Sequence, residues 1–339
     1  MLIANSGSRN PRLTAITTGL ALLAVVTAVA SLAFGSRDIG FGEVLDALGG
    51  GVDSDNATVI TSQRLPRTLI GLLAGVALGI AGALMQGHTR NPLADPGLFG
   101  VNAGASFAVA LLVFALGVTS PAAIVVAALT GAAAVSALVF ALGLGTMRGG
   151  ALVMLAILGT TLGALLSALT TALILLDKQT LDVMRFWDVG SLQARDVSLA
   201  WMLVPLMGLG LVLALVNGFA LNTLGLGDDV ARTLGIDVRT SRIMGVAAIT
   251  LLAGSATAWC GPIAFLGLVA PHAARAFCGH DYRWLVPLAG LIGAVLLGAA
   301  DTVGRVVARP GELQVGLVVA AFGAPLLLAL TRRRRLVSL

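Results

Sequence analysis

Two arginines, Arg64 and Arg67, stand just before a long apolar run and flank Pro66. A guanidinium group forms bidentate hydrogen bonds with carboxylates and phosphates, so this pair suits an acidic partner protein or a lipid phosphate. Farther along, Asp301 and Arg305 are four residues apart, a spacing that favours an ion pair within one helix. These residues predict recognition of charged groups rather than the making or breaking of bonds.

The residue types that hold metals or act as nucleophiles form no recognisable group in this sequence. The three histidines, His88, His272 and His280, match no metal-ligand spacing, and Cys260 and Cys278 form no CxxC motif. No GxxxxGK[ST] phosphate loop occurs, so any ATP hydrolysis would need a separate subunit. We therefore expect no catalytic residue, no metal site and no cofactor in the chain.

The longest hydrophilic break between apolar runs covers residues 221–242. Asp228 is placed to cap a short helix, because its carboxylate can accept the free amide hydrogens of the first turn, and Gly235 suits a left-handed stop. Four apolar residues would form a ridge along that helix: Leu226, Val230, Leu234 and Ile236. An exposed ridge indicates a partner protein, and an amphipathic connector lying on the membrane is the simpler alternative.

Hydroxyl side chains recur within the apolar run 151–176. They are Thr160, Ser167, Thr170 and Thr171. They could line a polar passage, or each could bond to a backbone carbonyl one turn earlier in its own helix. The sequence leaves both interpretations open.

The composition determines the class of protein to which these residues belong. Hydrophobic residues make up 58% of the 339 residues and charged residues 11%, with a mean hydropathy of +0.98. Such a chain has too few polar side chains to cover a soluble surface. The long apolar runs predict an all-α polytopic membrane protein, and β-barrel strands would be shorter and alternating. The net charge of +5 does not indicate nucleic-acid binding, because the basic residues lie in short breaks between apolar runs.

We expect about ten membrane spans. They lie near 13–34, 66–86, 96–116, 121–145, 151–176, 197–219, 243–260, 264–278, 284–303 and 315–331. The first run is too long for a signal-peptide core, so we expect it to be retained as a helix. The eighth is short for a full crossing and would be tilted or re-entrant. The basic tail Arg332–Arg335 favours cytoplasmic termini, which puts the 221–242 break in the cytoplasm too.

We expect residues 1–339 to form a single transmembrane domain. Two sequence patterns indicate how its spans pack. Gly71, Gly75 and Gly79 share one helical face and predict close approach of a neighbouring backbone. Residues 77–100 and 250–272 each combine a helix of small residues with a Pro- and Gly-rich irregular turn. Because these turns fall on opposite sides of the expected topology, the pattern indicates an inverted internal repeat.

Six stretches carry a resemblance to a known family, in order along nearly the whole chain. They are RLPRTLIGLLAGVALGIAGALMQ (64–86), TRNPLADPGLFGVNAGASFA (89–108), RFWDVGSL (185–192), LGDDVARTLG (226–235), GPIAFLGLVAPH (261–272) and GELQVG (311–316). The chain resembles the FecCD-type permeases of binding-protein-dependent ABC importers, the group for vitamin B12 and ferric siderophores. Within that group it is most similar to the permeases for ferric enterobactin.

This resemblance implies a type II ABC importer fold and an ATP-driven, alternating-access importer. A second, related permease subunit would complete a heterodimer in the cytoplasmic membrane. Two cytoplasmic ATPase subunits would hold ATP and Mg²⁺, and an external siderophore-binding protein would deliver a ferric siderophore. Haem or vitamin B12 is the alternative cargo.

The resemblance also implies roles for matched residues. Arg64, Arg67 and Arg305 match arginines that receive acidic residues of the binding protein. Asn91 and Leu93 match an inner gate, and the helix with Thr160 and its neighbouring hydroxyls matches the lining of the pathway. The coupling helix that seats in the ATPase is matched by Asp228, Asp229, Val230, Ala231, Arg232, Thr233, Leu234 and Gly235.

Two other classes of function fit less well. An ion-coupled secondary transporter would need ion ligands near the middle of the membrane, whereas Asp301 falls near an outer helix end. An intramembrane enzyme would need a catalytic pair, and none stands out.

Overall fold

A computed structural model describes residues 11–37, 39–50, 54–144, 151–193 and 197–332. Within these ranges every regular element is helical, and ten long helices lie at the predicted spans. They are α1 (Pro11–Ala33), α4 (Leu65–Thr89), α5 (Val101–Leu116), α6 (Pro121–Leu144), α7 (Ala151–Leu176), α9 (Ala200–Leu224), α11 (Val238–Cys260), α12 (Leu266–Cys278), α13 (Tyr282–Val307) and α14 (Val315–Arg332). The predicted all-α polytopic class is confirmed. Residues 333–335 of the basic tail lie outside the described residues.

Seven segments of the described chain are long and apolar enough to cross a membrane on their own, and α5 and α14 are shorter apolar helices. The shorter elements are α2 (Phe41–Leu48), α3 (Asp55–Val59), η1 (Ile60–Arg64), η2 (Pro96–Phe99), α8 (Lys178–Trp187), η3 (Val197–Leu199) and α10 (Asp228–Thr233). α3, η1 and α4 run on without a break as one 35-residue segment.

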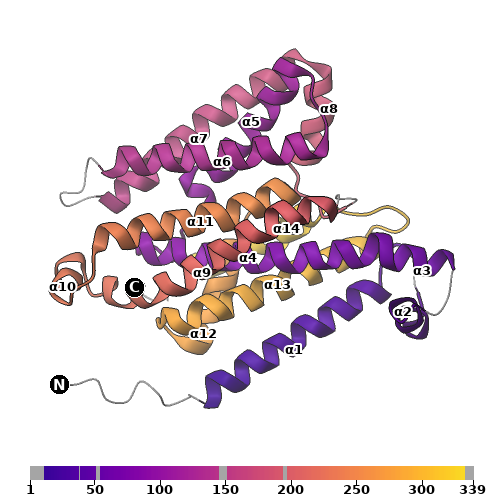
Figure 1. Cartoon of the computed structure of the whole chain (residues 1–339), viewed down its shortest axis with the longest axis horizontal. Coiled ribbons are helices and arrows are strands. Elements are labelled where there is room, and N and C mark those ends of the chain that lie inside the picture. The colour runs from indigo at the N-terminus through magenta and orange to yellow at the C-terminus, as the bar shows by residue number, and fades with distance from the viewer. Residues whose placement is uncertain (1–10, 38, 51–53, 145–150, 194–196, 333–339) are drawn as a thin grey trace.

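The long helices run roughly side by side along the long axis of the molecule (Figure 1). α10 lies at one end of the bundle, and α2 and α3 lie at the opposite end (Figure 1). We call these the α10 end and the α3 end. α5 to α8 form one group, while α1 lies on the outside and packs against α13.

α4 forms the centre of the bundle, and most of its length is buried. A Cβ added to Gly75 would lie 2.5 Å from the carbonyl oxygen of Gly293 on α13, and one on Gly79 would overlap the carbonyl oxygen of Ala289. The backbones of α4 and α13 therefore touch along the predicted glycine face, as in other membrane bundles. This confirms the packing interpretation of these glycines.

The two Pro- and Gly-rich turns lead into helices that start within the bundle. After the turn that follows α4, the chain forms η2, passes Gly100 in the left-handed region (φ 72) and only then starts α5. After α11, Phe265 is also left-handed (φ 67) and precedes the 13-residue α12. A Cβ on Gly267 would lie 2.6 Å from Pro96, so the two turns meet. The late start of α12, at Leu266, explains the short eighth span. The inverted repeat stays a prediction.

Two boundaries differ from the sequence prediction. The third span was expected to start at residue 96, but Pro96 and left-handed Gly100 restrict that stretch to a 3₁₀ turn before Val101. The seventh was expected near residue 243, but α11 begins at Val238, where Asp237 caps it by accepting from the backbone amides of Arg239 and Thr240. The break 221–242 therefore contains the ends of α9 and α11, and its non-spanning part is short.

Candidate functional site

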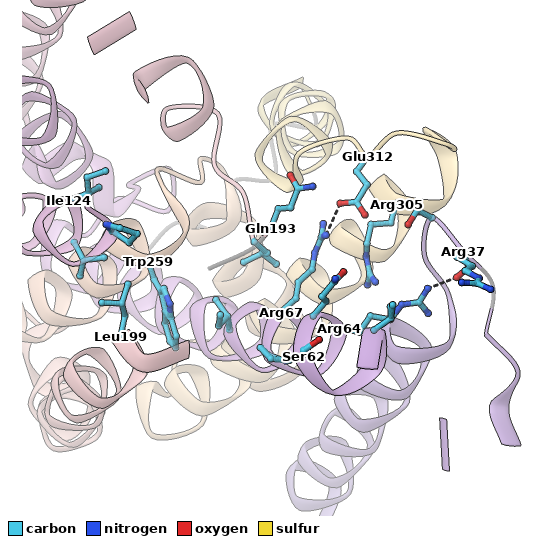
Figure 2. Close-up of a pocket in the computed structure, with 18 residues that line it drawn as sticks. Arg37, Ser62, Arg64, Arg67, Ile124, Gln193, Leu199, Trp259, Arg305 and Glu312 are labelled. Carbon is cyan, nitrogen blue, oxygen red and sulfur yellow. Dashed lines mark hydrogen bonds and ion pairs between the residues drawn. The ribbon is translucent and has the colours of Figure 1, made fainter. Parts of the chain in front are cut away.

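A cavity of about 760 Å³ opens at the α3 end of the bundle. Its charged lining residues are Arg37, Arg64, Arg67, Arg305 and Glu312. They come from the segment after α1, from η1 and α4, from α13 and from the loop before α14, as Figure 2 shows. Trp259 and Leu199 line the opposite, apolar part of the same cavity (Figure 2).

Arg64 is buried, at 6% exposure, and it fixes the end of α1. Its guanidinium donates to the carbonyl oxygens of Leu32 (2.6 Å) and Ala33 (2.9 Å), and also to that of Arg37. Arg64 therefore links η1 to the end of α1 and to the segment that follows it.

Arg67 binds two carboxylates at once. Its Nε and Nη2 donate to Asp301 at 2.8–3.0 Å, and its Nη1 donates to Glu312 at 2.6 Å (Figure 2). A fork of this kind fixes both the side chain and the loop that carries Glu312. Sequence reasoning included Glu312 only within a family motif and gave no signal that it would reach Arg67.

Arg305 forms the predicted ion pair with Asp301, at 3.1 Å between Nε and Oδ2. Its other nitrogens donate to the backbone oxygen (3.1 Å) and the hydroxyl oxygen (2.6 Å) of Ser31 on α1. Asp301 is thus shared by Arg67 and Arg305, two arginines from different helices.

Guanidinium groups predominate among the charged groups that line the cavity. Four guanidinium groups line the cavity, and two carboxylates, Asp301 and Glu312, pair with them. Guanidinium groups in such a recessed site favour an anionic group, because a field there is screened less than one on an open surface.

The opposite end of the bundle carries α10, and here one prediction was wrong. Asp228 does not cap the helix: Gly227 occupies that position, without any side-chain cap. The carboxylate of Asp228 instead forms ion pairs with Arg90 (2.6 Å) and Arg242 (2.5 Å). Two cations compete better for a carboxylate than the amides of a six-residue helix do.

The predicted stop of α10 is confirmed. Gly235 is left-handed (φ 84), its amide bonds to the carbonyl of Arg232, and the amide of Ile236 bonds to that of Ala231. This pair of bonds is a Schellman motif, which satisfies carbonyls at the helix end.

The apolar ridge on α10 is shorter than expected. Leu226, Val230 and Leu234 are 65%, 44% and 61% exposed. Ile236 instead packs partly against the core, because the Schellman turn directs the chain back toward the bundle. Among the coupling residues implied by the resemblance, Ala231 is fully buried, so it lies on the face opposite the ridge.

The turn after α4 contains the two predicted gate residues. Arg90 ends α4 in the left-handed region (φ 47). Exposed Asn91 accepts the backbone amide of Leu93 at 3.0 Å, and Leu93 is half-buried. The turn is irregular, as predicted, and is held by its own side-chain bond.

On α7 the hydroxyl groups bond to their own helix. Thr160 donates to the carbonyl of Ile157 (3.0 Å), Thr170 to that of Leu166 (2.8 Å) and Thr171 to that of Ser167 (2.9 Å). Thr170 is buried, whereas Thr160, Ser167 and Thr171 are exposed on a common face. The local interpretation is confirmed for three of the four residues, and pathway lining stays a prediction.

Among the carboxylates outside the spans, Asp237 and Asp188 have pKa values shifted in opposite directions. Hydrogen bonds from the side chain and backbone of Thr240 lower the pKa of Asp237, which keeps the cap of α11 ionised. Desolvation by the surrounding protein raises the pKa of Asp188, and the hydroxyl of Ser106 donates to it at 2.8 Å.

A helical bundle with long apolar helices, two irregular breaks, a basic cavity at one end and an exposed short helix at the other has the architecture expected of a transport permease. The FecCD transport family matches residues 22–333, and the chain belongs to that family.

The chain is similar to several curated permeases. It is 46% identical to the ferric enterobactin transport system permease protein FepD of Escherichia coli, over 93% of this chain and 94% of that protein. It is 37% identical to the probable siderophore transport permease YfiZ of Bacillus subtilis, covering 91% of this chain and 93% of the relative. It is 38% identical to the hemin transport permease HmuU of Yersinia pestis, over 80% and 82%.

One solved structure has the same fold. It is a metal-chelate type ABC transporter in an inward-facing conformation, with a TM-score of 0.83 and 28% identity. The match covers 94% of this chain and 99% of that one.

Proposed function

We propose that this chain is a transmembrane permease subunit of a binding-protein-dependent ABC importer that carries a ferric siderophore across the cytoplasmic membrane. The observation that carries the proposal is the 46% identity with a ferric enterobactin permease over 93% of the chain. Haem is the alternative cargo, because a hemin permease is 38% identical over a slightly shorter stretch.

The partners follow from the same proposal. ATP and Mg²⁺ bind to two separate cytoplasmic ATPase subunits, and a second permease subunit completes the pathway with the exposed face of α7 that carries Thr160, Ser167 and Thr171. Both termini and α10 lie in the cytoplasm, and the ridge on α10 seats in the ATPase. Asn91 and Leu93 form the inner gate.

The distribution of charge supports this class over an ion-coupled transporter. Asp301 is the one acidic residue of the ten long helices, and it is paired with Arg67 and Arg305 near the α3 end. A carboxylate held by two arginines is poorly suited to bind and release a coupling ion.

The external binding protein docks at the basic cavity of the α3 end. An acidic side chain of that protein would enter between Arg64, Arg67 and Arg305, whose guanidinium groups line the cavity. Glu312 already occupies one edge of Arg67, so a docking acid would share or replace this contact.

Uptake of iron-55 siderophores tests both parts of the proposal. Cells or liposomes with the complete transporter should import ferric enterobactin-type complexes in an ATP-dependent manner. Substitution Arg67→Gln should raise the concentration of loaded binding protein needed for half-maximal uptake by about tenfold, because a desolvated charge contact is lost.

The matched control is Arg185→Gln. Arg185 is exposed on α8 and pairs weakly with Asp182 at 3.6 Å. It should leave uptake unchanged. If the transporter imports haem but no ferric siderophore, the proposed cargo is wrong. If a folded Arg67→Gln transporter needs no more binding protein than the wild type for half-maximal uptake, the proposed docking site is wrong.

A further inference from the structure

One carboxylate at the α10 end holds two arginines from two different helices. Asp228 uses one oxygen for Arg90 (2.6 Å) and the other for Arg242 (2.5 Å). Arg242 lies in the first turns of α11 and is buried at 9% exposure, while Arg90 is the residue that ends α4. Asp228 is the first residue of α10. The three residues, which we call the Asp228 clamp, therefore connect α10 to α4 and α11.

The clamp also reaches α9. The same Nη2 of Arg90 that binds Asp228 donates to the carbonyl oxygen of Leu224, the last residue of α9, at 2.7 Å. Beneath the clamp, His88 of α4 bonds to Asn217 of α9 at 2.7 Å, and Asn217 donates to the backbone oxygen of Ser241 on α11 at 2.7 Å. Three long helices are thus joined by polar contacts where α10 is attached.

Arg90 is also the start of the irregular turn with the predicted gate residues. The backbone amide of Asn91 bonds to the carbonyl of Gln86 at 3.2 Å, which fixes it to α4, and the side chain of Asn91 accepts from Leu93 at 3.0 Å. A shift of Arg90 therefore moves Asn91 and Leu93 with it, because backbone and side-chain bonds connect all three.

The neighbouring carboxylate has a different environment. Asp229 has a side chain that is 98% exposed, and its ion pair is with Arg232 of the same short helix, at 2.9 Å. An ion pair inside one exposed helix connects nothing else. Of these two adjacent acids, Asp228 therefore contacts the bundle and Asp229 faces solvent.

We propose that Asp228 is a positioning residue that couples displacement of α10 to the turn at residues 90–95. The inference rests on the proposed importer function, in which the ATPase moves α10. Short, charge-assisted hydrogen bonds are directional, so the clamp transmits a sideways displacement of α10, whereas apolar contacts would allow the surfaces to slide. The gate residues then move with α10 through Arg90.

The first experiment uses the complete transporter, with its partner permease, ATPase and binding protein, in liposomes. Asp228→Asn should reduce the number of ferric siderophores imported per ATP hydrolysed by about tenfold, as expected when a coupling contact worth about 1.4 kcal/mol is lost. Asp228→Glu, which keeps the charge, should recover part of that ratio. Asp182→Asn, which removes an exposed carboxylate of α8, should import as the wild type does.

The second measurement does not depend on the cargo. A Leu93→Cys reporter, in a transporter whose native Cys278 and Cys260 are replaced by alanine, should change its rate of maleimide labelling when ATP and vanadate are added. Asp228→Asn should remove that change, and Arg90→Gln should have the same effect. The double variant should be no worse than either one, because both remove the same contact.

The outcomes separate the clamp from the importer proposal. If the wild type imports no ferric siderophore but its labelling responds to ATP and loses this response in Asp228→Asn, the cargo is wrong and the clamp stands. If the labelling of Asp228→Asn responds like the wild type, the clamp is wrong. If Asp228→Asn loses the ATPase subunit in proportion to its loss of transport, Asp228 acts in assembly, and the clamp is wrong as well.

Discussion

At the scale of single residues, Asp301 shows how a charge is tolerated in an apolar helix. Its side chain is 3% exposed and lies between Arg67 and Arg305, each within 3.1 Å. Removing one member of a buried group of charges is costly, because the others stay buried without compensation. Asp301 therefore stabilises the α3 end and also decides the orientation in which the two arginines face the cavity.

Substitution Asp301→Asn should lower the free energy of unfolding by about 3–5 kcal/mol, because Arg305 would lose its ion pair and Arg67 would keep only the one with Glu312. Thermal unfolding of the purified protein in detergent measures this. Asp182→Asn is the matched control, since Asp182 and Arg185 are both more than half exposed, and exposed pairs contribute little. Equal stability of the two variants would show that Asp301 is not essential to this network.

At the scale of elements, the glycine face of α4 brings three helices together, α4 itself, α13 and α12. Gly75 and Gly79 contact the backbone of α13, and a Cβ on Gly82 would overlap the carbonyl oxygen of Gly267 at the start of α12. Such contacts place the start of α12 against the C-terminal part of α4, where Gln86 donates to the carbonyls of Gly267 and Leu268 (3.4 Å each). Small residues thus fix the position of the second broken helix relative to the first.

Substitution Gly79→Ala should destabilise the bundle by about 1–3 kcal/mol, because the new methyl group meets the backbone of Ala289, which cannot move aside. Gly19→Ala on α1 is the control: nothing lies within 4 Å of its Cβ position, so it should leave stability unchanged or slightly raised. The midpoint of thermal unfolding and the yield of folded protein are the measurements. A normal midpoint for Gly79→Ala would mean that α4 and α13 do not touch there.

At the scale of the whole molecule, the two ends differ in their chemistry. The α3 end has a recessed basic cavity, while the α10 end has an exposed apolar ridge of Leu226, Val230 and Leu234. A recessed charge suits an acidic partner, and an exposed ridge suits an apolar groove. The two ends would therefore bind different proteins on the two sides of one membrane.

Cysteine labelling checks the side of each end. In intact cells, with both native cysteines replaced, an impermeant maleimide should label Thr61→Cys of η1 from outside and should label Thr233→Cys of α10 only after the membrane is opened. Both threonines are exposed in the structure, so differences in burial do not interfere. Labelling of Thr233→Cys in intact cells would show that the α10 end faces outward and that the proposed topology is wrong.

Much of this architecture is predictable from the sequence because apolar length and small-residue spacing are local properties. A run of about 20 apolar residues must form a helix in a bilayer, where no water can satisfy its backbone. The Asp301–Arg305 pair follows from spacing alone, and Gly235 follows from its tolerance of positive φ. The Pro- and Gly-rich stretch within residues 77–100 also indicated an irregular turn, although the start of α5 was placed several residues too early.

Tertiary structure alone decided the contacts between charges that lie far apart in the chain. Asp228 was expected to cap α10, but the fold brings Arg90 and Arg242 to it, and two cations outweigh backbone amides as partners. Arg67 was expected to meet an acidic partner protein or a lipid phosphate, and no sequence pattern indicated that Asp301 and Glu312 come within 2.8 Å and 2.6 Å of it across more than 230 positions. The sequence determines which charged side chains are present and where apolar runs and small-residue faces occur along the chain. Which charges meet depends on how the helices cross, and that is fixed by the close backbone contacts of α4, α12 and α13.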